Sequence, residues 1–132
     1  MTQQTSTSPT RSRDKVLQSL YEIEIAGTSL KDVLKDQFTK KNYPHYKALL
    51  EGIVESQDTI DELLEKNMDR ELSDLDPIER NVLRLAIYEL LNNNLDKPIV
   101  INESIRLTKK YGTAQGYKYV NALLDKIIKK GL

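Results

Sequence analysis

The spacing of apolar residues constrains this chain more than any other feature. From residue 13 to residue 130, apolar side chains recur at intervals of three and four positions, which is the repeat of a helix with one buried face. The strict apolar–polar alternation of a half-buried strand is absent from the sequence. The sequence therefore predicts an all-α protein, a single-domain bundle of six to seven helices.

The expected helices are separated by glycine, proline or asparagine. They cover residues 13–26, 30–38, 44–66, 77–91, 99–111 and 114–130. The clearest start is Asp76-Pro77-Ile78-Glu79, in which Asp76 is the expected N-cap and Glu79 completes a capping box. The helix that follows is apolar on nearly every side, which predicts a central and buried position.

The length and composition define a narrow class of protein. At 132 residues the chain suits one domain, expected over residues 11–132, after a small polar segment, residues 1–10, that we expect to be a disordered tail. The chain has no cysteine and one histidine, which excludes disulfides and cysteine-based zinc sites. It has no apolar run long enough to span a membrane and no secretory signal, so the expected location is the cytoplasm.

The charges cancel overall but are segregated along the chain. Residues 51–79 hold eleven acidic and two basic side chains, whereas residues 97–132 hold eight basic and two acidic ones. A basic surface attracts phosphate backbones even on a neutral protein. The alternative is an ordinary solvated surface with lysines placed at helix C-termini.

Two groups of residues are candidates for RNA contact. Arg11, Arg13 and Lys15 lie at the start of the first helix, where cations oppose the helix dipole and so require another explanation. Tyr119 falls off the apolar stripe of the last helix and lies beside Lys118, where it is placed to stack on an unpaired base. The alternative for Tyr119 is a half-buried packing role.

Nothing in the sequence favours catalysis or a cofactor. Carboxylates at helical spacing on residues 58–65 lack the histidines of a di-metal helical bundle. The sequence has no glycine-rich phosphate loop and no nucleophile with a nearby base. It therefore indicates a binding module with no metal, no cofactor and no catalytic residue.

Three segments carry a resemblance to a known family. They are IERNVLRLAIYELL at 78–91, PIVINESIRLTKKYG at 98–112 and KYVNALLDK at 118–126. These segments, with the Arg-rich start of the first helix, resemble the NusB transcription antitermination family over residues 11–130. The chain departs from the family pattern in four places. Asp14-Lys15 replaces a more basic and alanine-rich stretch, so the N-terminal arm is less cationic than in many relatives. The others are Asn67, where an aromatic residue is frequent, Thr108, where a small alanine is usual, and Ala122, where glycine is usual.

The resemblance implies a function in transcription regulation. It implies an all-helical protein that binds a boxA-type single-stranded RNA together with the ribosomal protein NusE, in the RNA polymerase antitermination complex that promotes ribosomal RNA transcription. A homodimer is an option, because some members of the family self-associate. The alternatives are a structural helical adaptor without an RNA role and a relative of the N-terminal RNA-binding domain of rRNA cytosine methyltransferases, which would require a long C-terminal catalytic domain.

The resemblance also assigns residues. It implies RNA contact by Arg11, Arg13, Lys15, Lys118 and Tyr119. It maps the surface for the protein partner onto Tyr21, Ile25 and Glu79.

Overall fold

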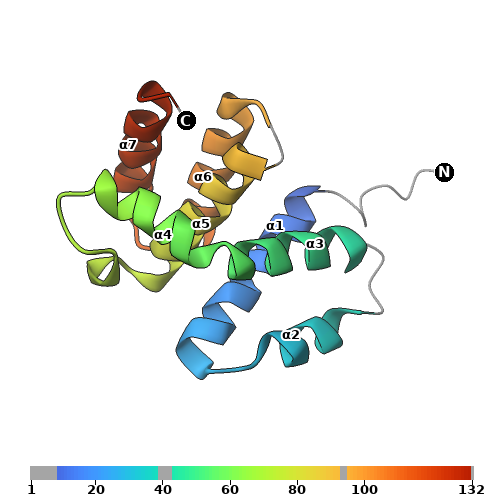
Figure 1. The fold of residues 1–132 in the computed structure, drawn as a ribbon. Helices are drawn as coiled ribbons and strands as arrows, with labels where there is room; N and C mark the ends of the chain where they lie inside the picture. The colour runs from blue at the N-terminus through green and yellow to red at the C-terminus, as the bar shows by residue number, and fades with distance from the viewer. Residues whose placement is uncertain (1–8, 39–42, 93–94, 132) are drawn as a thin grey trace. The chain divides into compact units, whose positions relative to one another are not determined.

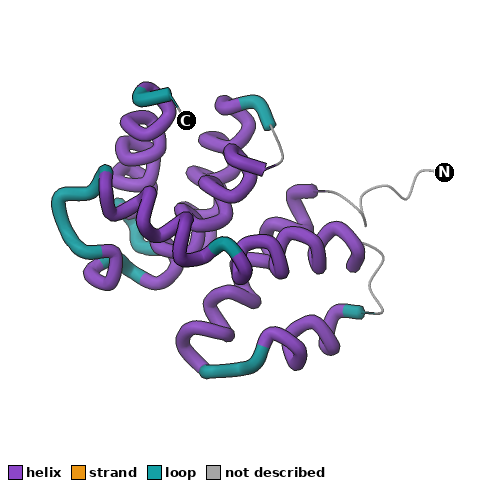
Figure 2. The backbone as a smooth tube through the Cα atoms, in the orientation of Figure 1, coloured by secondary structure: helices purple, strands orange, loops and turns teal. Residues whose placement is uncertain are grey.

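The computed structural model describes residues 9–38, 43–92 and 95–131, and all regular structure in them is helical (Figures 1 and 2). The all-α expectation is confirmed. The chain forms two compact units, residues 1–55 and 56–132. Residues 1–8 of the expected tail lie outside the described residues, and Pro9 and Thr10 already belong to the first helix.

The first unit is built on the pairing of its first and third helices. Helix α1 (Pro9–Tyr21) packs against α3 (Tyr43–Glu55), and α2 (Leu30–Gln37) contacts α3. Helix α1 continues into a π-helical turn, Glu22–Ala26, and ends at Gly27, whose φ of 73° is the left-handed conformation that terminates helices. The core is formed by the apolar stripes that the spacing predicts: Val16, Leu17, Leu20, Val33, Leu34, Tyr46, Leu49, Leu50 and Ile53.

Tyr46 brings a polar group into this core. Its side chain is 1% exposed, and its hydroxyl lies 2.7 Å from Ser19 Oγ and donates to the Val33 carbonyl at 3.4 Å. Burial raises the pKa of the Tyr46 hydroxyl above its ordinary value, because the phenolate would lose its hydration. The hydrogen bonds explain why a hydroxyl is tolerated inside the core.

The single long helix expected over residues 44–66 is wrong. The structure has two helices there, α3 and α4 (Gln57–Lys66), and Ser56 between them has a ψ of 7°, which takes the chain out of the helical conformation. The buried stripe resumes after the break, with Ile60 fully buried, so the apolar spacing carries no sign of the interruption. The break coincides with the boundary between the two units.

The second unit surrounds one central helix. Helix α5 (Pro77–Asn92) packs against α4, α6 (Lys97–Tyr111) and α7 (Gly116–Lys129), and α6 and α7 lie side by side (Figure 1). Most of α5 is buried, which confirms its predicted central place. The expected end at residue 91, before the three asparagines 92–94, is close to the observed one: Asn92 is the last residue of α5, and residues 93–94 lie outside the described residues.

Buried arginines tie α5 to the segments before it. Arg84 binds both carboxylate oxygens of Asp61 on α4, at 2.8 and 3.0 Å. Arg80 donates to the carbonyls of Leu72, the first residue of the 3-10 turn Leu72–Asp74, and of Leu75, which follows the turn, at 3.3 and 2.7 Å. These charge-assisted bonds fix the connection between α4 and α5.

Candidate nucleic-acid interface

The three predicted cations of α1 do not share one environment. Arg11 and Lys15 are exposed and lie four residues apart, so they fall on the same helix face. Arg13 is only 5% exposed. The structure therefore presents two of these three cations to solvent and buries the third in the first unit.

Lys118 and Tyr119 lie near the start of α7 in the second unit. Lys118 is exposed and Tyr119 is half-buried. The guanidinium carbon of Arg70 lies 4.3 Å from the centroid of the Tyr119 ring, which is the geometry of a cation–π contact. Both alternatives considered from the sequence therefore apply to Tyr119: its ring is partly packed, and it lies beside cationic side chains.

Arg70 is a neighbour of Tyr119 that the sequence did not predict. It lies in the connection between α4 and the 3-10 turn, far from Tyr119 along the chain, so no local spacing joins the two. Two further pairs repeat the arrangement on α6 and α7: Lys109 Nζ lies 4.6 Å from the Tyr117 centroid, and Lys110 Nζ lies 5.1 Å from that of Tyr111. The apolar spacing of the last helix places Tyr117 on the same stripe as Val120 and Leu124, which predicts a core position, but Tyr117 is only half-buried. Aromatic rings and cations are therefore interleaved in this part of the second unit.

Two of the predicted partner residues are exposed. Tyr21 is 39% and Ile25 52% exposed, at the end of α1 and in the π-helical turn. Large apolar side chains at neighbouring exposed positions are typical of protein interfaces.

Glu79 is a buried residue with a structural partner. It is 7% exposed, and its Oε2 accepts a hydrogen bond from Thr113 Oγ1 at 2.6 Å. The expected capping box is wrong in detail. Asp76 Oδ2 does cap the helix, but it accepts from Ile78 N–H at 3.0 Å, while the Glu79 carboxylate reaches the turn between α6 and α7 instead of the helix start. The hydrogen bond between Thr113 and Glu79 joins residues 34 positions apart, so the local sequence pattern could not predict it.

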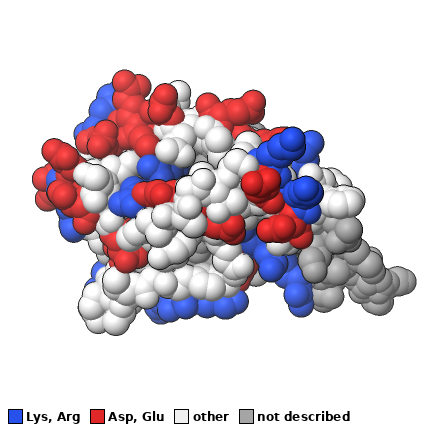
Figure 3. Space-filling model, turned by 90° about the horizontal axis from the view of Figure 1, so that it is seen from below, with Lys and Arg blue, Asp and Glu red and all other residues white. Residues whose placement is uncertain are grey.

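The charged side chains of the described residues are mixed on the surface and form no metal-ligand cluster. On the face drawn in Figure 3, acidic and basic side chains lie next to each other, so that face is not of one sign. Among the described residues, no three or more His, Cys, Asp or Glu side chains form a group that could hold a metal ion. No helix in the described ranges is both long and apolar enough to cross a membrane.

The fold and these surfaces define an all-helical protein with aromatic rings set among its cations. A family model described as "NusB family" matches residues 10–129. Among curated relatives, the transcription antitermination protein NusB of Marinobacter nauticus is 34% identical over 91% of this chain and 80% of its own length, and that of a Nitratiruptor species is 36% identical over 91% of each. The chain belongs to the NusB family.

Solved structures of the family have the same fold. NusB of T. maritima superposes with a TM-score of 0.87 at 32% identity, covering 95% of this chain and 93% of that one. A crystal structure titled as antitermination factors NusB and NusE in complex with dsRNA contains a chain that superposes with a TM-score of 0.79 at 29% identity, covering 92% of this chain and 96% of that one.

Proposed function

We propose that this protein is a cytoplasmic transcription antitermination factor that binds boxA-type RNA together with the ribosomal protein NusE and promotes ribosomal RNA transcription. The family match over residues 10–129 is the observation that carries the proposal. The similar chain solved with NusE and RNA supports both partners. The role is one of binding and needs no catalytic group.

The RNA contacts follow from exposure and chemistry. In this proposal Arg11, Lys15 and Lys118, all exposed, neutralise phosphates, and Tyr119 stacks on a base with the ring face that Arg70 leaves open. Arg13, which is buried, is left out of the phosphate contacts of this proposal.

The partner contacts centre on Tyr21 and Ile25. Their exposed apolar surface suits NusE, and the acidic stretch 51–79 would steer a basic ribosomal protein toward this chain. Glu79 acts as a positioning residue, because its carboxylate holds the turn at Thr113.

An RNA titration tests the first half of the proposal. Labelled boxA-like single strand and a duplex of matched length are titrated by fluorescence anisotropy, with and without NusE and over a range of salt. Tyr119→Ala should weaken binding by roughly 1–3 kcal/mol, about 5- to 150-fold, while Tyr119→Phe keeps the ring and the affinity. Failure to bind RNA under every condition would leave the adaptor as the better description.

A NusE titration tests the second half. Tyr21→Ala should weaken NusE binding by more than about 1 kcal/mol and leave RNA binding by the isolated protein unchanged. Phe38→Ala is the matched control, because Phe38 is another exposed aromatic residue of the same unit, 61% exposed. Equal effects of the two substitutions would move the interface away from Tyr21.

A further inference from the structure

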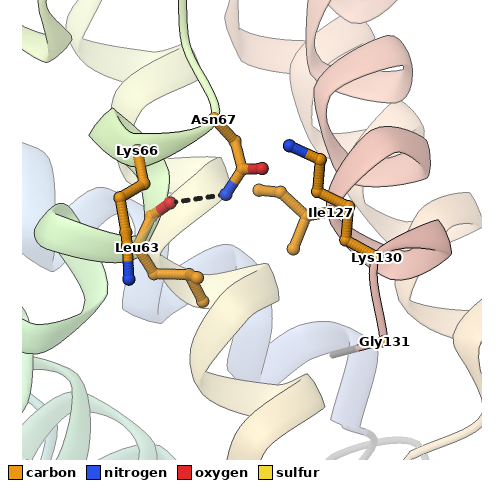
Figure 4. A pocket seen from close by; sticks show the side chains of 6 residues that line it. All are labelled: Leu63, Lys66, Asn67, Ile127, Lys130 and Gly131. Atoms are coloured by element: carbon orange, nitrogen blue, oxygen red, sulfur yellow. Dashed lines mark hydrogen bonds between the residues drawn. The ribbon is translucent and has the colours of Figure 1, made fainter.

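The second unit has an open pocket between the ends of two helices. Helices α4 and α7 both pack on α5, and their C-terminal ends line this pocket, which has a volume of about 400 Å³ (Figure 4). Leu63 and Ile127 supply its apolar lining, and Lys130 extends from α7 toward Asn67. The residues that line it are Leu63, Lys66, Asn67, Ile127, Lys130 and Gly131. A volume of this size lies in the range of ligand-binding pockets.

Cations connect this pocket to Tyr119. Tyr119, Lys126 and Lys130 are spaced by seven and four residues, which places them along one face of α7. Lys126 Nζ donates to the Asn67 carbonyl at 2.9 Å, and Arg70 lies on the Tyr119 ring. This face of α7 and residues 66–70 together form what we call the α7 groove, with Tyr119 at one end and the pocket at the other.

Among the residues that the structure describes, the lysines of the α7 groove form no ion pair with a carboxylate, although the exposed Asp69 belongs to the same segment 66–70. Elsewhere in the second unit basic side chains are paired, as in Arg84–Asp61, Arg106–Glu103 and Lys129–Asp125. Within the described residues, no carboxylate lies within ion-pair distance of Lys66, Lys126 or Lys130.

The helix dipole alone does not explain this arrangement. It favours a cation at each helix C-terminus, and Lys126 does satisfy a carbonyl at the end of α4. The helix dipole does not explain why the C-terminal ends of α4 and α7 line the same partly apolar pocket. Nor does it explain why Tyr119 lies on the same face of α7 as the lysines. A row of like charges beside such a ring suits a single-stranded polyanion.

We propose that the α7 groove extends the RNA-binding face, so that RNA beyond the nucleotide stacked on Tyr119 follows α7 to the pocket, where Lys66 and Lys130 neutralise phosphates. This inference rests on the proposed function. From Tyr119 to Lys130 the helix rises about 16 Å at 1.5 Å per residue, which corresponds to about five stacked nucleotides at about 3.4 Å each. The proposal therefore predicts that lengthening the RNA raises its affinity when the added nucleotides are at one end of the strand, and not when they are at the other.

The test compares RNAs that differ at one end. A short boxA-like single strand is titrated by anisotropy alone and with five added nucleotides at its 5′ or its 3′ end. One of the two extensions should strengthen binding by the wild-type protein. With a salt slope of about 0.7 per phosphate on single strands, two added phosphate contacts give about 25-fold at about 0.1 M salt.

A charge-matched pair of variants assigns this gain to the groove. Lys66→Gln with Lys130→Gln should abolish the gain and lower the salt slope by about 1.4, with the short RNA still bound. Lys31→Gln with Lys97→Gln removes the same charge from two exposed lysines outside the groove and should keep the gain. Circular dichroism confirms that both variants are folded.

Three results would overturn the inference. The first is an equal affinity of the wild type for short and extended RNAs, and the second is a gain that survives in the Lys66 and Lys130 variant. In both cases the short RNA is still bound, so the proposed function stands. The third is a loss of NusE binding in that variant with the RNA gain intact, which would make the groove a protein interface. Absence of any RNA binding by the wild type would overturn the proposed function as well.

Discussion

Gly116, the first residue of α7, lies against the Glu79 side chain at the start of α5, and Gly116→Ala is the substitution that tests this contact. A methyl group there would collide with Glu79 Oε2, would lie 2.5 Å from Glu79 Cδ and would lie 2.8 Å from Thr113 Oγ1. Carbon atoms do not approach this closely, so the Glu79 carboxylate would have to leave its place. Its 2.6 Å hydrogen bond from Thr113 would break.

The expected loss of stability is the difference between two terms. A hydrogen bond to a charged, buried group contributes about 1.5–3 kcal/mol, which the substitution removes. Alanine in place of glycine at a helical position returns about 0.5–1 kcal/mol. We therefore expect Gly116→Ala to destabilise the protein by about 1–2 kcal/mol.

Gly116→Ala should raise the free energy of unfolding, instead of lowering it, when Glu79 is also replaced by alanine. In a Glu79→Ala background the collision with the carboxylate is gone. The Thr113 hydroxyl, released from its hydrogen bond to Glu79, can rotate away from its 2.8 Å contact, so the helical gain of about 0.5–1 kcal/mol remains. Urea unfolding of the four proteins, followed by circular dichroism at one pH and temperature, gives the coupling energy between the two sites. Additive effects, with a coupling near zero, would refute the contact between Gly116 and Glu79 as the cause.

Three further predictions concern the two cores. Leu85→Ala, at a position of α5 that is 2% exposed, should cost roughly 2–5 kcal/mol of unfolding free energy in urea, and a loss below 1 kcal/mol would contradict the central place of α5. Asp76→Ala removes the acceptor of Ile78 N–H and should cost about 1 kcal/mol by the same assay, with Asp76→Asn as the control that keeps a capping oxygen. Burial raises the pKa of Tyr46, so the folded protein keeps this proton above pH 10.0, where the unfolded chain releases it, and stability should fall as the pH rises beyond that value. The fall should be smaller in Tyr46→Phe, and parallel pH profiles of the two proteins would show that Tyr46 is not responsible.

The sequence was sufficient where the determining interactions are local. The apolar surround of α5 predicted its central position, Asp76 with Pro77 marked its first turn, and Gly27 and Gly131, both with positive φ, end their helices as expected. The exposed cations Arg11 and Lys15 could likewise be chosen from their place on one helix.

The sequence was insufficient where residues from different segments meet. The apolar residues keep their helical spacing on both sides of Ser56, so the spacing did not predict that the helix is interrupted there. The Glu79–Thr113 bond, the position of Arg70 on Tyr119 and the burial of Arg13 depend on tertiary packing, which no spacing of residues encodes. The sequence therefore supplied candidate residues for the site from their type and helix position. It did not supply the side chains that contact them or the burial of Arg13.

The π-helical turn that follows α1 makes the length of the chain adjustable at that point. Its bonds run from residue i to residue i+5, so Glu22–Ala26 holds one residue more than an α-helical turn. Deletion of one residue there lets the turn close as an α-helix, with Tyr21 before it and Gly27 after it still in register. A deletion within Pro9–Tyr21 instead rotates every later helical residue by about 100° and turns the buried stripe out of the core. Single-residue length differences between relatives should therefore accumulate in this turn and be rare in the helix before it.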